Sequence, residues 1–393
     1  MATPEFPRIE ASVVVAKPAL QQILKNLQVA GFALVGPTRR DDSIQLDELA
    51  GVADLPRGWT EEYGPGHYRL KKISDTVYFA YGPGPHSWKR FLFPPRQKLF
   101  AVKRNPVPSG AEGDGQWTFE PVQETKPKYA FIGIRSCDVS AIGVLDRVFL
   151  SCPPAVGDPH YARRRTSIFL LAVYCTHAAP TCFCASMKAG PQVETGFDLA
   201  FTELPDSFVV RIGSEAGAEM LAETEWTPAT AFELGQARKA HQQSEREQQR
   251  QIRTDDLPKM LYDNLDHPRW EQVAKRCLSC ANCTLACPTC FCSTVEDTSD
   301  LSATVCERTR VWDSCFVLDF SHVSGGNIRP ATRARYRQWL THKLASWIDQ
   351  FGVIGCVGCG RCITWCPVGI DITEEVKALR EKPALSRAEG VVS

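Results

Sequence analysis

Two cysteine-rich segments near the end of the chain constrain its fold more than any other feature. "CLSCANCTLACP" spans residues 277–288 and "CVGCGRCITWCP" spans residues 356–367, and each has the spacing C-x2-C-x2-C-x3-C-P. Three thiols at steps of three residues let one short loop contact three corners of a cubane [4Fe–4S] cluster, while the fourth thiol points elsewhere. The repeated pattern therefore predicts two iron–sulfur clusters.

The fourth cysteine of each segment is predicted to bind the cluster of the other segment, as in two-cluster bacterial ferredoxins. We expect Gly355, Gly358 and Gly360 to let the backbone approach the second cluster closely. Four thiolates also suit tetrahedral zinc, but zinc ribbons pair two C-x2-C knuckles from separate hairpins, so the spacing favours clusters. The predicted ligands are Cys277, Cys280, Cys283 and Cys366 for cluster 1, and Cys356, Cys359, Cys362 and Cys287 for cluster 2.

A long insertion, residues 293–355, separates the two motifs. Its segment "RYRQWLTHKLASWIDQF" has apolar residues at helical spacing, which predicts a helix that covers the clusters with its apolar face in the core. The expected fold class is α+β: an N-terminal α/β domain followed by an α-helical ferredoxin-like domain carrying two [4Fe–4S] clusters. The apolar residues are Trp339, Leu340, Leu344, Trp347, Ile348 and Phe351.

Four cysteines of the N-terminal half match no standard spacing. The apolar run 130–134 and the helical periodicity of 139–149 predict a strand, a turn and a helix, with Cys137 at the turn. A second buried strand ends at Cys175, and Cys182 and Cys184 would point the same way in an extended loop. A third cluster held by these four thiols, a zinc site and inert buried thiols all remain open.

Three further cysteines lie beside the motifs without an assigned site. Cys290 and Cys292 directly follow the first motif, and Cys315 lies in "VWDSCF". Because the two predicted clusters already have four thiolates each, we expect these thiols to pack beside a cluster. The alternative is a further site at a subunit interface.

Changes in cysteine content and polarity divide the chain. Residues 1–213 are expected to form the N-terminal α/β domain, and residues 276–393 the two-cluster domain. Residues 214–275 are polar and charged, with good helix formers, and are expected to form a connecting helical segment. Its surface is predicted to be solvated, with docking of a partner as the alternative.

Composition and missing motifs limit the function classes. Lys and Arg together equal Asp and Glu at 45 each, which argues against nucleic-acid binding. The longest apolar run is far shorter than the roughly 20 residues needed to span a bilayer, and the first residues do not resemble a signal peptide. A cytoplasmic protein without membrane contact is expected, in a compartment where cysteine clusters hold metals more often than disulfides.

The chain also lacks the usual nucleotide, flavin, zinc-protease and serine-hydrolase fingerprints. We therefore predict no catalytic and no organic-cofactor-binding residue, and interpret the chain as an electron carrier. The alternatives are an N-terminal half that is itself catalytic and an iron–sulfur sensor or DNA-binding protein. The neutral charge and the paired motifs argue against the sensor.

Several segments together resemble the β subunit of cytosolic NAD(P)-linked [NiFe] hydrogenases, or sulfhydrogenases, and the related A subunit of anaerobic sulfite reductase. The segments are "RSCDVSAI", "CFCASMKAGP", "RCLSCANCTLACPTCFCS", "RVWDSCFVLDFS", "RYRQWLTHKL" and "GCVGCGRCITWCPVGIDI". The resemblance implies a subunit that docks on a flavin/NAD(P)-binding reductase subunit and exchanges electrons with the hydrogenase small and large subunits, or with a sulfite reductase subunit. The family pattern includes Cys137, Cys182 and Cys184, which strengthens the case for an N-terminal site. The chain's length and N-terminal extension favour the hydrogenase.

Overall fold

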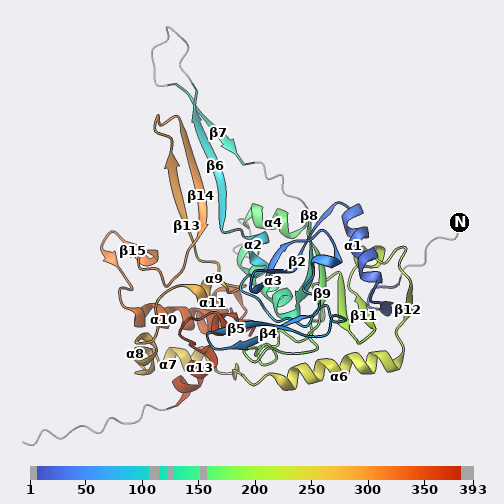
Figure 1. Ribbon diagram of the computed structural model, residues 1–393. Coiled ribbons are helices and arrows are strands. Elements are labelled where there is room, and N and C mark those ends of the chain that lie inside the picture. Colours follow the sequence, from blue (N-terminus) through green and yellow to red (C-terminus); the bar gives the residue numbers. More distant parts are fainter. Residues whose placement is uncertain (1–6, 106–114, 123–127, 151–156, 382–393) are drawn as a thin grey trace, which may run out of the picture.

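An eight-stranded mixed sheet organises the N-terminal half of the chain (Figure 1). The computed structural model describes residues 7–105, 115–122, 128–150 and 157–381. The four central strands run parallel and the outer strands antiparallel. In spatial order the strands are β12 (Trp226–Pro228), β1 (Ser12–Ala16), β11 (Ser207–Ile212), β10 (Leu199–Glu203), β9 (Phe169–Val173), β8 (Lys128–Arg135), β2 (Phe32–Arg40) and β3 (Ser43–Glu48).

Helices cover both faces of this sheet. On β8, Ala130 and Ile132 pack in one core cluster with α1 (Ala19–Val29), whereas Phe131 packs in another cluster with α3 (Ser136–Phe149). Because both faces are buried, β8 and β9 are continuous apolar runs instead of alternating ones. The predicted mixed α/β architecture of the N-terminal half is confirmed.

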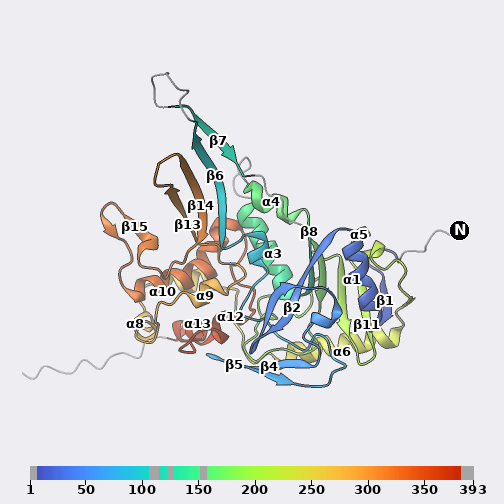
Figure 2. The same ribbon diagram turned by 45° about the horizontal axis from the view of Figure 1, so that its top comes forward.

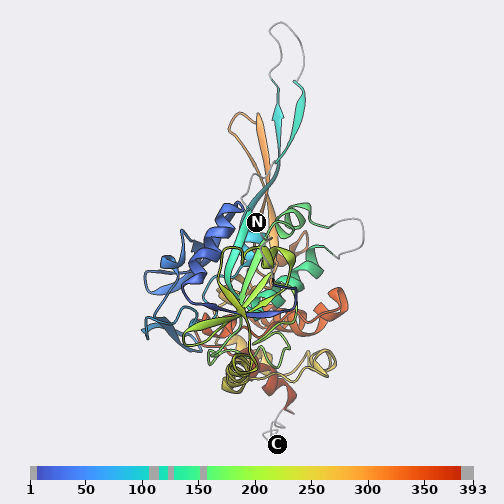
Figure 3. The ribbon, with the colours of Figure 1, turned by 90° about the vertical axis from the view of Figure 1, so that its right-hand side faces the viewer.

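A second, four-stranded sheet projects from the body as an arm (Figures 1 and 3). Its central pair joins β6 (Arg96–Arg104) to β14 (Val305–Trp312), two strands that lie about half the chain apart in sequence. The outer strands are β7 (Trp117–Pro121) and β13 (Ser293–Ser299). The domain predicted to be α-helical therefore also contains a β-hairpin, which begins the insertion between the cysteine motifs and pairs with a strand of the N-terminal half.

Short helices form the C-terminal part, beside α3 and to one side of the large sheet (Figure 2). The predicted helix of residues 335–351 is present as one continuous helical path that includes a π-helical turn, and Trp339, Leu340, Leu344 and Trp347 are buried. The helices are α7 (Leu257–Asp263), α8 (Arg269–Ala274), α9 (Asn282–Leu285), α10 (Thr332–Thr341), the π turn His342–Ser346, α11 (Trp347–Phe351), α12 (Arg361–Thr364) and α13 (Ile372–Arg380).

The polar segment 214–275 packs on both halves. Its long helix, α6 (Ala231–Glu247), contacts β11 and buries His241, which hydrogen-bonds Thr202 at 2.9 Å. No helix of the described residues is long and apolar enough to cross a membrane. The remaining elements are α2 (Lys89–Leu92), α4 (Pro159–Arg165), α5 (Glu215–Glu219), β4 (Trp59–Gly64), β5 (His67–Lys72), β15 (His322–Val323), β16 (Gly326–Asn327) and the 3-10 turns Val52–Asp54 and Asp319–Ser321.

Candidate metal centres

The two cysteine motifs fold in the same way. In each, the second and fourth residues after the first cysteine have left-handed backbone: φ is 53° at Ser279 and 66° at Ala281, and 66° at Gly358 and 76° at Gly360. One helical turn then follows, α9 in the first motif and α12 in the second. Ser279 and Ala281 adopt this conformation at a cost of about 1 kcal/mol each, so the surrounding structure imposes this loop path on the first motif.

The thiols predicted for cluster 1 line one cavity. Cys277, Cys280 and Cys283 from the first motif meet Cys366 from the second, which is the crossed arrangement that the spacing predicts. Among the described residues, no three His, Cys, Asp or Glu side chains converge on a single-ion position. A cubane is larger than one ion and takes its thiolates at separate corners, which suits thiols placed around a cavity. The walls also include Phe316, Tyr336, Trp339, Cys362 and Ile370.

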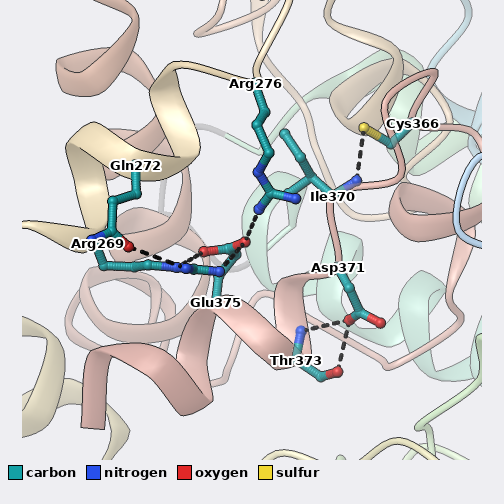
Figure 4. A network of polar contacts seen from close by, with 8 residues as sticks. All are labelled: Arg269, Gln272, Arg276, Cys366, Ile370, Asp371, Thr373 and Glu375. Carbon is teal, nitrogen blue, oxygen red and sulfur yellow. Dashed lines mark hydrogen bonds and ion pairs between the residues drawn. The ribbon is translucent and has the colours of Figure 1, made fainter. Parts of the chain in front are cut away.

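A polar network holds Cys366 and the start of the first motif in place (Figure 4). The Ile370 amide donates to Cys366 Sγ at 3.3 Å. Glu375 on α13 is almost fully buried and accepts from Arg269 and Arg276, and Arg276 directly precedes Cys277 in sequence. This carboxylate therefore ties α13 to α8 and to the first residues of the first motif.

The thiols predicted for cluster 2 also lie together. Burial raises the pKa of Cys356 to about 12, and the charges of Cys287 and Cys359 add to the shift. Burial likewise raises the pKa of Cys362, with contributions from Cys356, Cys359 and Cys287. Lys343 Nζ donates both to Cys287 Sγ at 3.4 Å and to the Gly355 carbonyl at 3.0 Å, so Cys287 of the first motif lies beside the start of the second motif.

Two of the four N-terminal thiols, Cys137 and Cys175, lie at the carboxyl ends of the neighbouring parallel strands β8 and β9. Cys137 is the second residue of α3, which begins directly after β8 without the predicted turn, and Cys175 lies two residues beyond β9. Burial raises the pKa of Cys182, and the charges of Cys184 and Cys175 raise it further. Cys184 likewise acts on Cys137. Cys137 and Cys184 pack in one core cluster, and Cys182 Sγ lies 3.9 Å from the Cys359 carbonyl oxygen. Cys137, Cys182 and Cys184 are buried.

The loop that carries Cys182 and Cys184 packs directly on the second motif. The Phe183 amide donates to the Gly358 carbonyl at 2.8 Å. A Cβ at Gly358 would lie 2.6 Å from the Phe183 carbonyl oxygen, and one at Gly360 would lie 2.5 Å from that of Thr181. Gly358 and Gly360 thus let the N-terminal loop approach the second motif. The sequence predicted only that these glycines let the backbone approach a cluster. Gly355 is likewise packed against Trp347.

Of the three unassigned thiols, Cys290 contacts the predicted ligand Cys287, and Cys292 and Cys315 contact each other. A hydrogen bond with Cys287 raises the pKa of Cys290. A hydrogen bond with the Cys315 thiol lowers the pKa of Cys292 to about 7. Thiols that pack beside a cluster and thiols of a further site would both give such contacts, so the expectation stays a prediction.

Sequence reasoning missed two side chains that contact these thiols. Gln248, in the predicted connecting segment, donates from Nε2 to Cys184 Sγ at 3.4 Å. Lys343 donates from Nζ to Cys287 Sγ, also at 3.4 Å. Neither residue belongs to a motif, and no pattern in the sequence marks them.

Comparison with known proteins places this arrangement in context. Residues 276–370 match the family model of the 4Fe-4S dicluster domain. The chain is 30% identical over 349 residues to Sulfhydrogenase 2 subunit beta of Pyrococcus furiosus, and the match covers 88% of this chain and 92% of that subunit. No solved structure matches the chain.

Proposed function

The chain belongs to the family of sulfhydrogenase beta subunits, and from this membership we propose that it relays single electrons between a flavin/NAD(P)-binding subunit and the catalytic subunits of a [NiFe] hydrogenase. Its 4Fe-4S dicluster domain makes it an iron–sulfur electron-transfer subunit of an oxidoreductase. The observation that carries the finer proposal is the shared cavity of Cys277, Cys280, Cys283 and Cys366. Two motifs joined in this way keep two clusters side by side.

We assign Cys277, Cys280, Cys283 and Cys366 to cluster 1, and Cys356, Cys359, Cys362 and Cys287 to cluster 2. Bound cubanes supply one-electron transfer, while a nicotinamide exchanges a hydride at a flavin. The residues of this chain would hold the thiolates at fixed positions, with Cys287 and Cys359 buried and Cys356 and Cys362 half-buried. A relay of this kind connects two-electron to one-electron chemistry.

The N-terminal thiols extend the relay in this proposal. Cys137, Cys175, Cys182 and Cys184 would hold a third cluster, and two observations support it: Cys137 and Cys184 pack in one core cluster, and Cys182 Sγ lies 3.9 Å from the carbonyl oxygen of Cys359. The order would then be cluster 1, cluster 2 and the N-terminal site.

The cluster 1 end faces solvent, and we place one partner contact there. Cys280 is exposed, and Leu278 beside it is 64% exposed. Leu285 and Val368 add exposed apolar surface next to the two motifs. An apolar patch around a cluster ligand suits a docked redox subunit, since such a contact would exclude water from the transfer path.

The test is purification of the native complex with identification of its subunits. A nickel-containing large subunit supports the proposal, whereas a sirohaem subunit would assign the chain to an anaerobic sulfite reductase. The isolated chain, loaded with iron and given an artificial electron donor, should turn over no substrate. Turnover there would instead favour a catalytic N-terminal half.

A further inference from the structure

A lysine is buried inside the C-terminal domain at the cluster 2 group. Lys343 is 2% exposed and lies in the π-helical turn His342–Ser346, between α10 and α11. π turns inserted into α-helices occur frequently at functional sites. The Gly355 amide donates to the Lys343 carbonyl at 2.9 Å, which fixes this turn against the start of the second motif.

The ammonium group of Lys343 uses all three of its donors. It donates to Cys287 Sγ at 3.4 Å, to Thr289 Oγ1 at 3.2 Å and to the Gly355 carbonyl at 3.0 Å. None of these three partners is a carboxylate, and no carboxylate among the described residues forms an ion pair with Lys343. Thr289 in turn donates to the Gly355 carbonyl at 2.7 Å and lies 3.2 Å from Cys287 Sγ, so the ammonium has a defined position.

A buried ammonium is costly unless an anion compensates it. The anion that the geometry offers is the thiolate of Cys287 with the cluster it would hold. Reduction adds one negative charge to a cluster, and a fixed positive charge in a buried site favours that charge. The sign is therefore determined: the ammonium favours the reduced state.

We propose that Lys343 is a positioning residue whose ammonium, held against Cys287 Sγ, raises the reduction potential of cluster 2 above that of the same cluster without it. The inference rests on the ligand assignment in the proposed function. It deepens that function by naming a residue that makes cluster 2 a better electron acceptor than the same cluster would be without the charge.

A second buried lysine provides a matched control. Lys89 is 3% exposed, and its Nζ donates to the Cys290 carbonyl at 2.8 Å and lies 4.0 Å from the centre of the Trp312 ring. It thus contacts the segment after the first motif without donating to a predicted ligand sulfur. Lys89→Met removes a buried ammonium nearby but leaves the Lys343 contact intact.

The experiment is a potentiometric titration of the iron-loaded protein, followed by electron paramagnetic resonance. Lys343→Met removes the charge, Lys343→Gln removes it but keeps an amide donor, and Lys343→Arg keeps it. The cluster 2 signal is identified as the one altered by Cys356→Ser. We expect both neutral variants to lower the ratio of reduced to oxidised cluster 2 at least tenfold at a fixed potential. For one electron, this corresponds to a fall of about 59 mV in the midpoint potential of cluster 2. Lys343→Arg and Lys89→Met should shift the midpoint potential of cluster 2 less. The midpoint potential of cluster 1 should be unchanged in all variants.

Each outcome decides the inference. Equal cluster 2 potentials in the wild type and in the iron-loaded neutral variants would overturn it, leaving Lys343 a structural residue only. Loss of iron from both neutral variants, with iron retained in Lys343→Arg, would also overturn it as stated, because the charge would then be needed to hold the cluster and not to set its potential. Wild-type protein without a second cluster signal would instead overturn the ligand assignment of the proposed function.

Discussion

Arg361 and Asp138 form a buried, two-pronged ion pair between residues 223 positions apart. Nη1 and Nη2 of Arg361 each donate to one carboxylate oxygen of Asp138 at 2.9 Å, and both side chains are 2% exposed. Arg361 lies between Cys359 and Cys362 in the second motif, and Asp138 follows Cys137. The pair therefore fixes the start of α3, which carries Cys137, against the second cysteine motif.

Asp138→Asn should destabilise the protein strongly. Removing one partner leaves the Arg361 guanidinium buried without a compensating charge, which costs about 3–5 kcal/mol. The midpoint of anaerobic thermal unfolding measures this effect. Asp297→Asn is the control, because Asp297 forms a similar two-pronged pair with Arg308 at the exposed surface. We expect a much smaller loss there, because solvent screens an exposed ion pair; comparable losses in the two variants would contradict the role given to the buried pair.

Crossed ligation predicts that a substitution in the second motif damages the cluster held mainly by the first motif, although the two motifs are far apart in sequence. Cys366→Ser should damage the cluster held by Cys277, Cys280 and Cys283, because all four thiols line one cavity. Electron paramagnetic resonance of the reduced variant should show a changed cluster 1 signal and an intact cluster 2 signal. Cys356→Ser should give the reverse. If Cys366→Ser alters only the cluster changed by Cys356→Ser, the assignment is wrong.

Iron content tests the N-terminal thiols. Three cubanes require about twelve irons per chain, and two require about eight. We expect the wild type near twelve and the double variant Cys182→Ser with Cys184→Ser near eight. Cys306→Ser is the control, since Cys306 lies in β14 of the arm. A wild-type value near eight, unchanged in the double variant, would refute a third cluster.

Glu61 should make stability depend on pH near neutrality. Burial raises the pKa of its carboxyl to about 7, although the Gly82 amide and Tyr68 hydroxyl donate to it. The protonated acid is favoured in the folded state, so its contribution is present below the unfolded pKa of about 4.3 and is lost as the pH rises through about 7. Between pH 6 and pH 8 the loss is about 1 kcal/mol.

Glu61→Gln should remove this pH dependence, as measured by the thermal midpoint at pH 6 and pH 8. Glu62→Gln, one residue along β4 and exposed, serves as the control and should unfold like the wild type at both values. If the difference in thermal midpoint between pH 6 and pH 8 is unchanged in Glu61→Gln, another group is responsible for the pH dependence.

The sequence predicted the parts of the site that local pattern controls. The thiol spacing predicted that Cys366 would join Cys277, Cys280 and Cys283, and apolar periodicity predicted the helix of residues 335–351. Continuous apolar runs predicted β8 and β9, which bring Cys137 and Cys175 to the same edge of the sheet. In each case the signal lies within a segment or in a repeated motif.

The features that were missed depend on distant contacts. The strand "STVEDTS" of β13 has only one large apolar residue, and its hairpin is extended by β6, which lies in the other half of the chain. Lys343 would be expected to face solvent, but the π turn changes the helical repeat and the residue is buried. Periodicity within one segment carries no information about either.

The most direct test of the account is rapid-freeze electron paramagnetic resonance of the native complex after mixing with its electron donor. If the chain is a relay, signals of reduced [4Fe–4S] clusters must appear at least as fast as the complex turns over, and Cys366→Ser must slow both cluster reduction and turnover. Full turnover while these clusters stay oxidised, or reduce more slowly than the complex turns over, would contradict the account.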